Sequence, residues 1–296
     1  MLRTKHKRTL SLRHYSLKSL KILFVLLISA IATPAHAHEP LFGLGPHTIY
    51  KGGVGIEVAV EGERASNSDE KERELSLHTE IMYGITENLA VTLATPLVLK
   101  KSHDEGSGED NSSGIGDITL RTKYRFWNHD SPGTKDSAAL IIGIKLPTGE
   151  DGKTPKLGTG STDFIFGLTA ARESLRWYYF GDIRYRLNTR GSGNMKKGNR
   201  VFADLAIGIR AWATEYLKPD LVFMAEVNWE SLMRDELNGA DLNDSGGNRL
   251  FFSPSFFFTY RNWAIKGGVQ IPLYQNLYGD QAEDKYRFKI SVETHL

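Results

Sequence analysis

The side chains with the most evident chemistry are charged residues that recur at every second position of short segments. Arg121, Lys123 and Arg125 form one such row, and a row of basic side chains is one way in which a pore selects anions. The pore-lining candidates that share this parity are Arg121, Lys123, Arg125, Lys145, Asp163, Asp182, Arg184, Arg186, Arg210, Glu226, Lys266 and Arg287. Further charged positions of the same kind are Glu80, Asp204, Glu230, Arg249, Lys289 and Glu293. Because the set mixes both signs, it predicts either a weakly anion-attracting pore or an internal ladder of ion pairs that satisfies a polar interior.

Two histidines near the start of the chain suggest a metal site. If a leader is cleaved after Ala37, His38 becomes the N-terminal residue, where amine and imidazole together can chelate copper or zinc. Glu39 adds a carboxylate, and His47 follows closely. The alternative is a solvated tail that binds no metal, and no other cofactor is expected.

Catalysis is not expected from this sequence. The chain has no cysteine, so thiolate nucleophiles and thiolate metal sites are excluded. His78 is the one histidine in the middle of a predicted strand, and the sequence places no Ser or Asp beside it. Residues 158–162 superficially resemble a phosphate loop but lack the lysine that follows in a true one. We therefore predict that the protein is not an enzyme.

The N-terminus predicts export. Residues 1–21 hold seven basic residues and no acidic one, residues 22–31 are apolar, and Ala35-His36-Ala37 offers small residues for signal peptidase. The alternative, an uncleaved anchor helix, is disfavoured by Thr33-Pro34. Loss of residues 1–37 changes the net charge from +2 to −5, so the basic leader argues for no nucleic-acid partner.

The rest of the chain alternates polar and apolar residues with period 2, which indicates strands. In residues 117–127, for example, Ile118, Leu120 and Tyr124 share one face and the basic row the other. Twelve such segments are predicted: 48–61, 73–85, 88–99, 117–127, 137–148, 161–172, 177–189, 200–213, 221–231, 249–260, 263–274 and 285–296. Each is long enough to cross a hydrocarbon layer as a tilted strand.

The connections alternate between long polar loops and mostly shorter turns, as in outer-membrane barrels. Trp127, Trp177, Trp212 and Trp263 fall near the short-turn ends, where an interfacial aromatic belt lies, although Trp127 and Trp212 have inward parity. A soluble β-sandwich would also alternate, but with its apolar face inward. We predict a twelve-stranded antiparallel barrel over residues 48–296 in the outer membrane of a Gram-negative bacterium. Residues 38–47 are expected to form a short periplasmic segment.

Four motifs carry a resemblance to a known family. They are Gly114 to Phe126, Ile144 to Gly149, Gly158 to Asp163 and Asn262 to Pro272. Over nearly the whole mature chain they resemble proteobacterial outer-membrane proteins named for the meta pathway of phenol degradation. The opening residues 38–47 resemble a subgroup associated with heavy-metal resistance.

The resemblance implies passive transport of a small organic solute, either an aromatic compound or another small organic molecule. Implied partners are outer-membrane lipid, the secretion and barrel-assembly machinery and the solute itself. Two alternatives remain open: a metal-binding or metal-resistance accessory that uses His38 and His47, and a structural barrel without an open pore.

Overall fold

The computed structural model describes residues 39–104, 108–212 and 218–296. The predicted signal peptide and His38 lie outside the described residues. Within the described ranges, no helix is long and apolar enough to cross a membrane.

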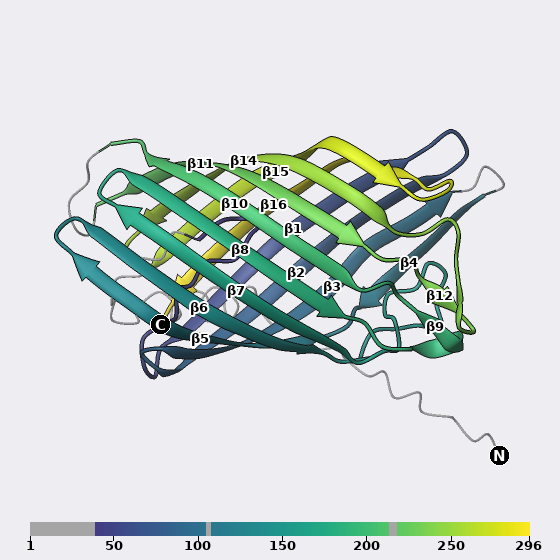
Figure 1. Cartoon of the computed structure of the whole chain (residues 1–296), viewed down its shortest axis with the longest axis horizontal. Helices are drawn as coiled ribbons and strands as arrows, with labels where there is room; N and C mark the ends of the chain where they lie inside the picture. Colours follow the sequence, from purple (N-terminus) through teal and green to yellow (C-terminus); the bar gives the residue numbers. More distant parts are fainter. Residues whose placement is uncertain (1–38, 105–107, 213–217) are drawn as a thin grey trace, which may run out of the picture. The chain divides into compact units, whose positions relative to one another are not determined.

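Most of the described chain belongs to one antiparallel sheet (Figure 1). Its strands are β1 (Val54–Ser66), β2 (Lys71–Thr86), β3 (Leu89–Asp104), β4 (Glu109–Ile115), β5 (Thr119–Ser131), β6 (Thr134–Lys145), β7 (Asp163–Ser174), β8 (Trp177–Leu187), β10 (Arg200–Arg210), β11 (Asp220–Leu232), β14 (Gly247–Tyr260), β15 (Trp263–Leu277) and β16 (Glu283–His295). β1 pairs with both β2 and β16, which closes the sheet into a barrel. β4 and β5 both pair with β3 and fill one place in the wall. The described residues thus confirm the predicted twelve-stranded barrel.

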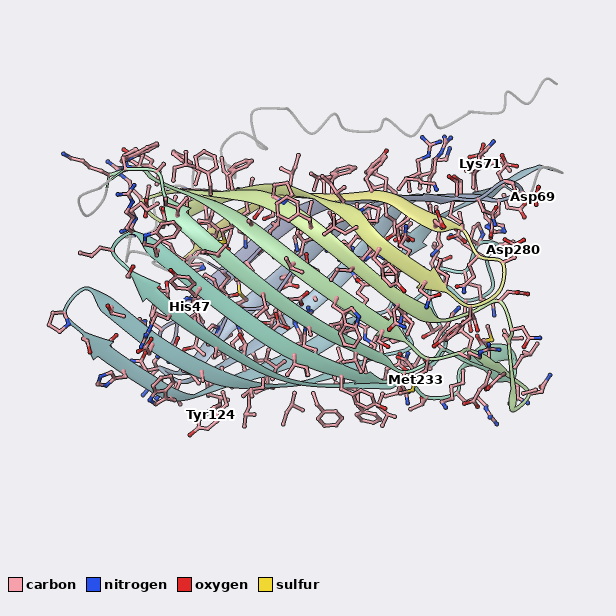
Figure 2. All side chains as sticks on the ribbon, turned by 45° about the horizontal axis from the view of Figure 1, so that its top comes forward. His47, Asp69, Lys71, Tyr124, Met233 and Asp280 are labelled. Carbon is pink, nitrogen blue, oxygen red and sulfur yellow. The ribbon has the colours of Figure 1, made fainter. Side chains whose placement is uncertain are left out.

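The wall is apolar outside and polar inside. Leu205 and Ile142 keep 68% and 60% of their surface exposed on the outer face, and Tyr124 also points outward (Figure 2). By contrast, Glu226 and Asp163 face the interior and are almost fully buried. Exposed apolar area costs roughly 25 cal/mol per Å² in water, so this inverted pattern requires lipid around the barrel. It excludes the β-sandwich.

A β-bulge corrects the expected orientation of one tryptophan. The register of β5 against β6 shifts between Arg125 and Trp127, so that Arg125 pairs with Ala139 but Trp127 pairs with Ala138. A bulge places one extra residue in one strand and reverses the facing of those that follow. Trp127 is therefore 48% exposed on the outer face, although simple alternation directs it inward.

Several strands extend further than their apolar pattern predicts. Residues 128–136, expected as a loop, are largely strand, because β5 runs to Ser131 and β6 begins at Thr134. Residues 100–116, also expected as a loop, hold the end of β3 and all of β4. These extensions are polar because they lie beyond the part of the wall that contacts lipid hydrocarbon. Strands can pair there without an apolar outer face.

The long-loop rim, which is extracellular in barrels of this class, carries a second small sheet. β9 (Met195–Lys196), which follows the short 3₁₀ helix η1 (Ser192–Asn194), pairs with β12 (Glu236–Leu237), and β12 pairs with β13 (Ala240–Asp241). An ion pair of 2.6 Å joins Lys196 to Glu236. The C-terminus lies at the opposite, short-turn rim (Figure 1).

The location of the N-terminal residues differs from the prediction. Residues 38–47 were expected in the periplasm, but the described residues 39–47 lie inside the barrel. The first strand also begins at Val54 rather than at residue 48. Gly52, at a φ of 79°, forms the turn that precedes this strand, a conformation that favours glycine.

The lipid-facing role of the outer surface can be tested at Leu205, the middle residue of β10. Leu205→Lys should destabilise the folded barrel by about 2 to 4 kcal/mol, because a lysine near the bilayer midplane cannot be solvated. Urea unfolding in lipid vesicles measures this difference. Leu175→Lys, in the turn between β7 and β8, should cost about 0 to 1 kcal/mol. Equal costs at the two positions would contradict a membrane-embedded wall.

Candidate functional site

The candidate site is the barrel interior, which residues 39–47 partly fill. We call these residues the plug. The plug has no regular secondary structure, so its backbone groups need partners other than neighbouring strands. The lumen wall supplies them through carboxylate and hydroxyl side chains.

Glu226 on β11 provides the central anchor of the plug. Its carboxylate accepts hydrogen bonds from the backbone N–H groups of Leu41, Phe42 and Gly43 at 2.9, 3.1 and 3.1 Å. The hydroxyl of Ser255 donates a fourth at 3.1 Å. Glu226 makes no ion pair with a described residue, so these four donors offset the burial of its carboxylate.

A second anchor holds both polar groups of Leu44. Its N–H donates to Asp182 Oδ1 at 2.7 Å, and its carbonyl accepts from the Thr169 hydroxyl at 2.6 Å. Asp182 is itself held by Arg184 at 2.7 Å, and the same guanidinium contacts Asp204. The anchor is therefore built from three adjacent strands, β7, β8 and β10.

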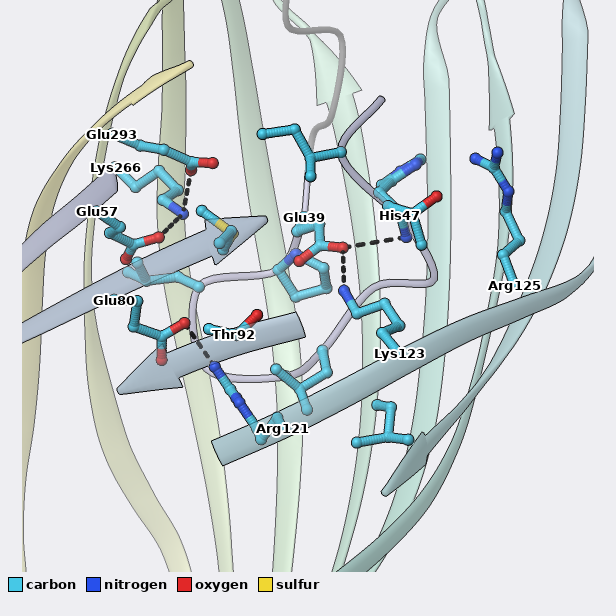
Figure 3. A pocket seen from close by; sticks show the side chains of 18 of the residues that line it. Glu39, His47, Glu57, Glu80, Thr92, Arg121, Lys123, Arg125, Lys266 and Glu293 are labelled. Atoms are coloured by element: carbon cyan, nitrogen blue, oxygen red, sulfur yellow. Dashed lines mark hydrogen bonds and ion pairs between the residues drawn. The ribbon is translucent and has the colours of Figure 1, made fainter. Parts of the chain in front are cut away.

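The two ends of the plug are also tied to the wall (Figure 3). Glu39 Oε1 accepts from Lys123 Nζ at 2.8 Å and from the backbone N–H of His47 at 3.1 Å. The His47 side chain also contacts the wall, because its Nε2 lies 2.9 Å from Oε1 of Glu173 on β7. The N-terminal copper or zinc site stays a prediction, because His38 lies outside the described residues.

Below the plug, residues 48–53 lead to the short-turn rim. The Tyr50 hydroxyl donates to the carbonyl of Leu296, and the Gly52 N–H donates to that of Gly84 at 2.7 Å. A Cβ on Gly84 would lie 2.0 Å from the Tyr50 carbonyl oxygen. This close approach requires glycine at position 84. It holds residues 48–53, which follow the plug, at the rim.

The plug separates two cavities among the described residues. One, of about 450 Å³, lies toward the short-turn rim and is lined by Glu57, Glu80 and Arg121. The other, of about 510 Å³, lies toward the long loops and is lined by Arg186 and Arg200. Leu41 and Phe42 line both. The plug is thus the partition that a solute would have to pass.

The basic row on β5 is largely neutralised. Arg121 pairs with Glu80, and Lys123 pairs with Glu39. Arg125 donates to Asn88 Oδ1 and to the backbone carbonyl of Glu87, at 3.1 and 2.8 Å. The structure therefore favours the ion-pair ladder for this row, and its role in anion selection stays a prediction.

The other pore-lining candidates are likewise buried or half-buried, and most pair with an acid. Nearest N–O distances are 2.8 Å for Lys145–Asp163, 2.9 Å for Arg210–Asp220, 2.6 Å for Lys266–Glu57 and 2.7 Å for Arg287–Glu230. Arg186 is different, because it makes no ion pair with any described residue.

Asp117 holds the long loop that follows β6 through hydrogen bonds, a role that was not predicted from the sequence. Its carboxylate accepts from Lys145 Nζ at 2.7 Å and from the backbone N–H groups of Thr159 and Gly149 at 2.9 Å. Burial alone would raise the pKa of Asp117, but these donors together hold that pKa below its usual range. The carboxylate thus stays ionised and keeps the loop in place.

Other important residues were also missed. The Thr169 hydroxyl bonds the plug and the Ser255 hydroxyl bonds its anchor Glu226, yet a hydroxyl in a strand carries no sequence signal for such a contact. Arg200 was not among the candidates. It shares the parity of Asp204 and Arg210 within residues 200–213, and this alternation is the sequence signal that could have placed it in the lumen.

Solved structures similar to this chain are outer-membrane barrels. An outer membrane channel from Pseudomonas putida F1 matches with a TM-score of 0.70 and 13% identity, over 88% of this chain and 100% of that one. The β-domain of the Bordetella autotransporter BrkA matches with a TM-score of 0.49 and 11% identity, over 83% and 100%. The CymD monoaromatic hydrocarbon channel matches with a TM-score of 0.41 and 11% identity, over 84% and 89%. The first likeness shows the fold.

No curated protein matches the chain. A family model does match, over residues 72–274. This stretch covers most of the barrel, from β2 into β15, and includes the motifs that suggested the family. The protein therefore lies in the outer membrane and belongs to the family described as "Putative MetA-pathway of phenol degradation".

Proposed function

We propose that the protein is a passive outer-membrane channel for a small organic solute, and that movement of the plug controls passage. The single observation that carries this proposal is the partition of the lumen into two cavities by residues 39–47. Each cavity, at about 450 and 510 Å³, has the size of a site for one small molecule, roughly 300 to 1,000 Å³. The proposal includes no covalent step and no cofactor.

The way in which the plug is held supports its movement. It contacts the wall mainly through side-chain hydrogen bonds, each of which contributes a net 0.5 to 3 kcal/mol or so. Water that enters the lumen can replace these bonds one by one. No disulfide fixes the plug, since the chain has no cysteine. Its opening is therefore a matter of a few exchangeable contacts, not of unfolding the barrel.

The chemistry of the solute is suggested by the family and by the cavities. The family is named for phenol degradation, which supports an aromatic compound. Phe42 lines the extracellular cavity beside charged groups. A small molecule with an apolar ring and a polar substituent fits such a lining.

Glu226→Gln tests the anchor. An amide accepts fewer and weaker hydrogen bonds than a carboxylate, so the plugged state should weaken relative to the open one by roughly tenfold. Single-channel recording of the refolded barrel in planar bilayers should show a larger open fraction. Asp136→Asn is the matched control, because its partner Arg172 lies outside the lumen with 65% of its side chain exposed. An unchanged open fraction in Glu226→Gln would count against control by the plug.

A reversible lock tests the movement itself. A Cβ on Gly43 would lie 3.2 Å from Cβ of Asp204, slightly closer than the roughly 3.5 to 4.5 Å of disulfides. The Gly43→Cys, Asp204→Cys double variant should lose conductance when oxidised and regain it on reduction. Each single variant should not respond to reductant. An oxidised double variant that conducts like its reduced form would exclude plug movement, and silence in every state would indicate a structural barrel.

A further inference from the structure

Two arginines in the extracellular cavity stand apart from the ion-pair ladder. Arg186 on β8 and Arg200 on β10 occupy directly opposite positions of the antiparallel register. Both line the cavity of about 510 Å³. Like charges directly opposite one another destabilise a sheet, so this pair calls for an explanation.

Neither guanidinium has an acidic partner among the described residues. The side chains of Arg186 and Arg200 make no ion pair and no hydrogen bond within the described ranges, and Arg186 Nε is fully buried without an acceptor. The contact that Arg186 does make is with the Phe202 ring, 6.0 Å from the guanidinium carbon to the centroid. Leaving a buried donor unsatisfied destabilises the folded protein, and more strongly when the group is charged.

The acids nearby are already engaged. Asp163 binds Lys145 at 2.8 Å and accepts from the Ser161 hydroxyl at 2.9 Å. Glu230 binds Arg287 at 2.7 Å. Acidic residues that line the same cavity are also paired, with Glu61 3.0 Å from Lys289 and Glu74 2.9 Å from Lys101. Glu63, which also lines this cavity, lies 3.8 Å from Arg287. No carboxylate of the described residues therefore forms an ion pair with Arg186 or Arg200.

We propose that Arg186 and Arg200 form a subsite for the carboxylate of a small organic acid, which occupies the extracellular cavity before it passes the plug. Arginine presents a planar fork of donors that matches a carboxylate, often through two parallel hydrogen bonds. Two forks face one cavity here, so one carboxylate can be held by both. The inference rests on the proposed channel function and names the class of its solute.

The rest of the cavity suits the remainder of such a molecule. Phe42 lines it, and Phe202 carries the face on which Arg186 stacks. An apolar ring attached to the carboxylate would therefore meet aromatic side chains. Because Phe42 belongs to the plug, the bound acid would touch the element that controls passage.

Benzoate binding to the folded, detergent-solubilised barrel tests the subsite. Isothermal titration calorimetry should show binding of benzoate, and much weaker binding of benzyl alcohol, which keeps the ring but lacks the charge. Arg186→Gln and Arg200→Gln should each weaken benzoate binding by roughly 10- to 100-fold. Arg186→Lys, which keeps the charge but not the fork, should retain part of the affinity. Arg172→Gln, which removes an arginine outside the lumen, is the matched control and should bind benzoate like the unaltered protein.

Benzoate and benzyl alcohol of equal affinity, or unchanged benzoate binding in both glutamine variants, would overturn the subsite. Heat-modified mobility in gel electrophoresis verifies that each variant is folded. Binding does not require conduction, so the two proposals can fail separately. A silent barrel with arginine-dependent benzoate binding would reject the channel alone. A conducting barrel without such binding would reject the subsite alone.

Discussion

The structure depends on one constraint: no backbone hydrogen-bonding group can be left unpaired in lipid. A sheet meets this constraint only by closing on itself, which the pairing of β1 with β16 achieves. Closure turns the apolar face outward and encloses the polar one. All charges on the inner face must then find partners within a confined lumen, and the function follows from how they do so.

Most of these charges pair with one another along the inner wall, but two features depart from this ladder. Among the described residues, Glu226 has no basic partner and is instead satisfied by three backbone N–H groups of the plug. Arg186 and Arg200 have no acidic partner in the same ranges. The first feature recruits a segment of the chain into the lumen, and the second leaves positive charge at its extracellular mouth. Both result from an imbalance of donors and acceptors in an otherwise neutralised interior.

The sequence was sufficient to predict the twelve strands, their inward and outward faces and the alternation of loop lengths, because period-2 alternation is a local signal. It could not predict the plug. Residues 39–47 have no periodicity, and Glu226, their main anchor, lies more than 180 positions away. The sequence also could not predict the bulge at Trp127, because the bulge depends on how β5 pairs with β6. For the charged residues, the alternation along each strand gave the correct face but could not identify the ion-pair partners. The basic row on β5 therefore suggested a positively charged pore, whereas Glu80 and Glu39 largely neutralise this row.

The most direct test of the central claim, that the plug partitions the lumen, is the single-channel conductance of the mature barrel with residues 38–47 deleted. If the plug is the partition, the shortened barrel should conduct steadily and more strongly than the intact one, because the two cavities merge into one passage. A folded, shortened barrel with the same conductance as the intact protein would contradict this account.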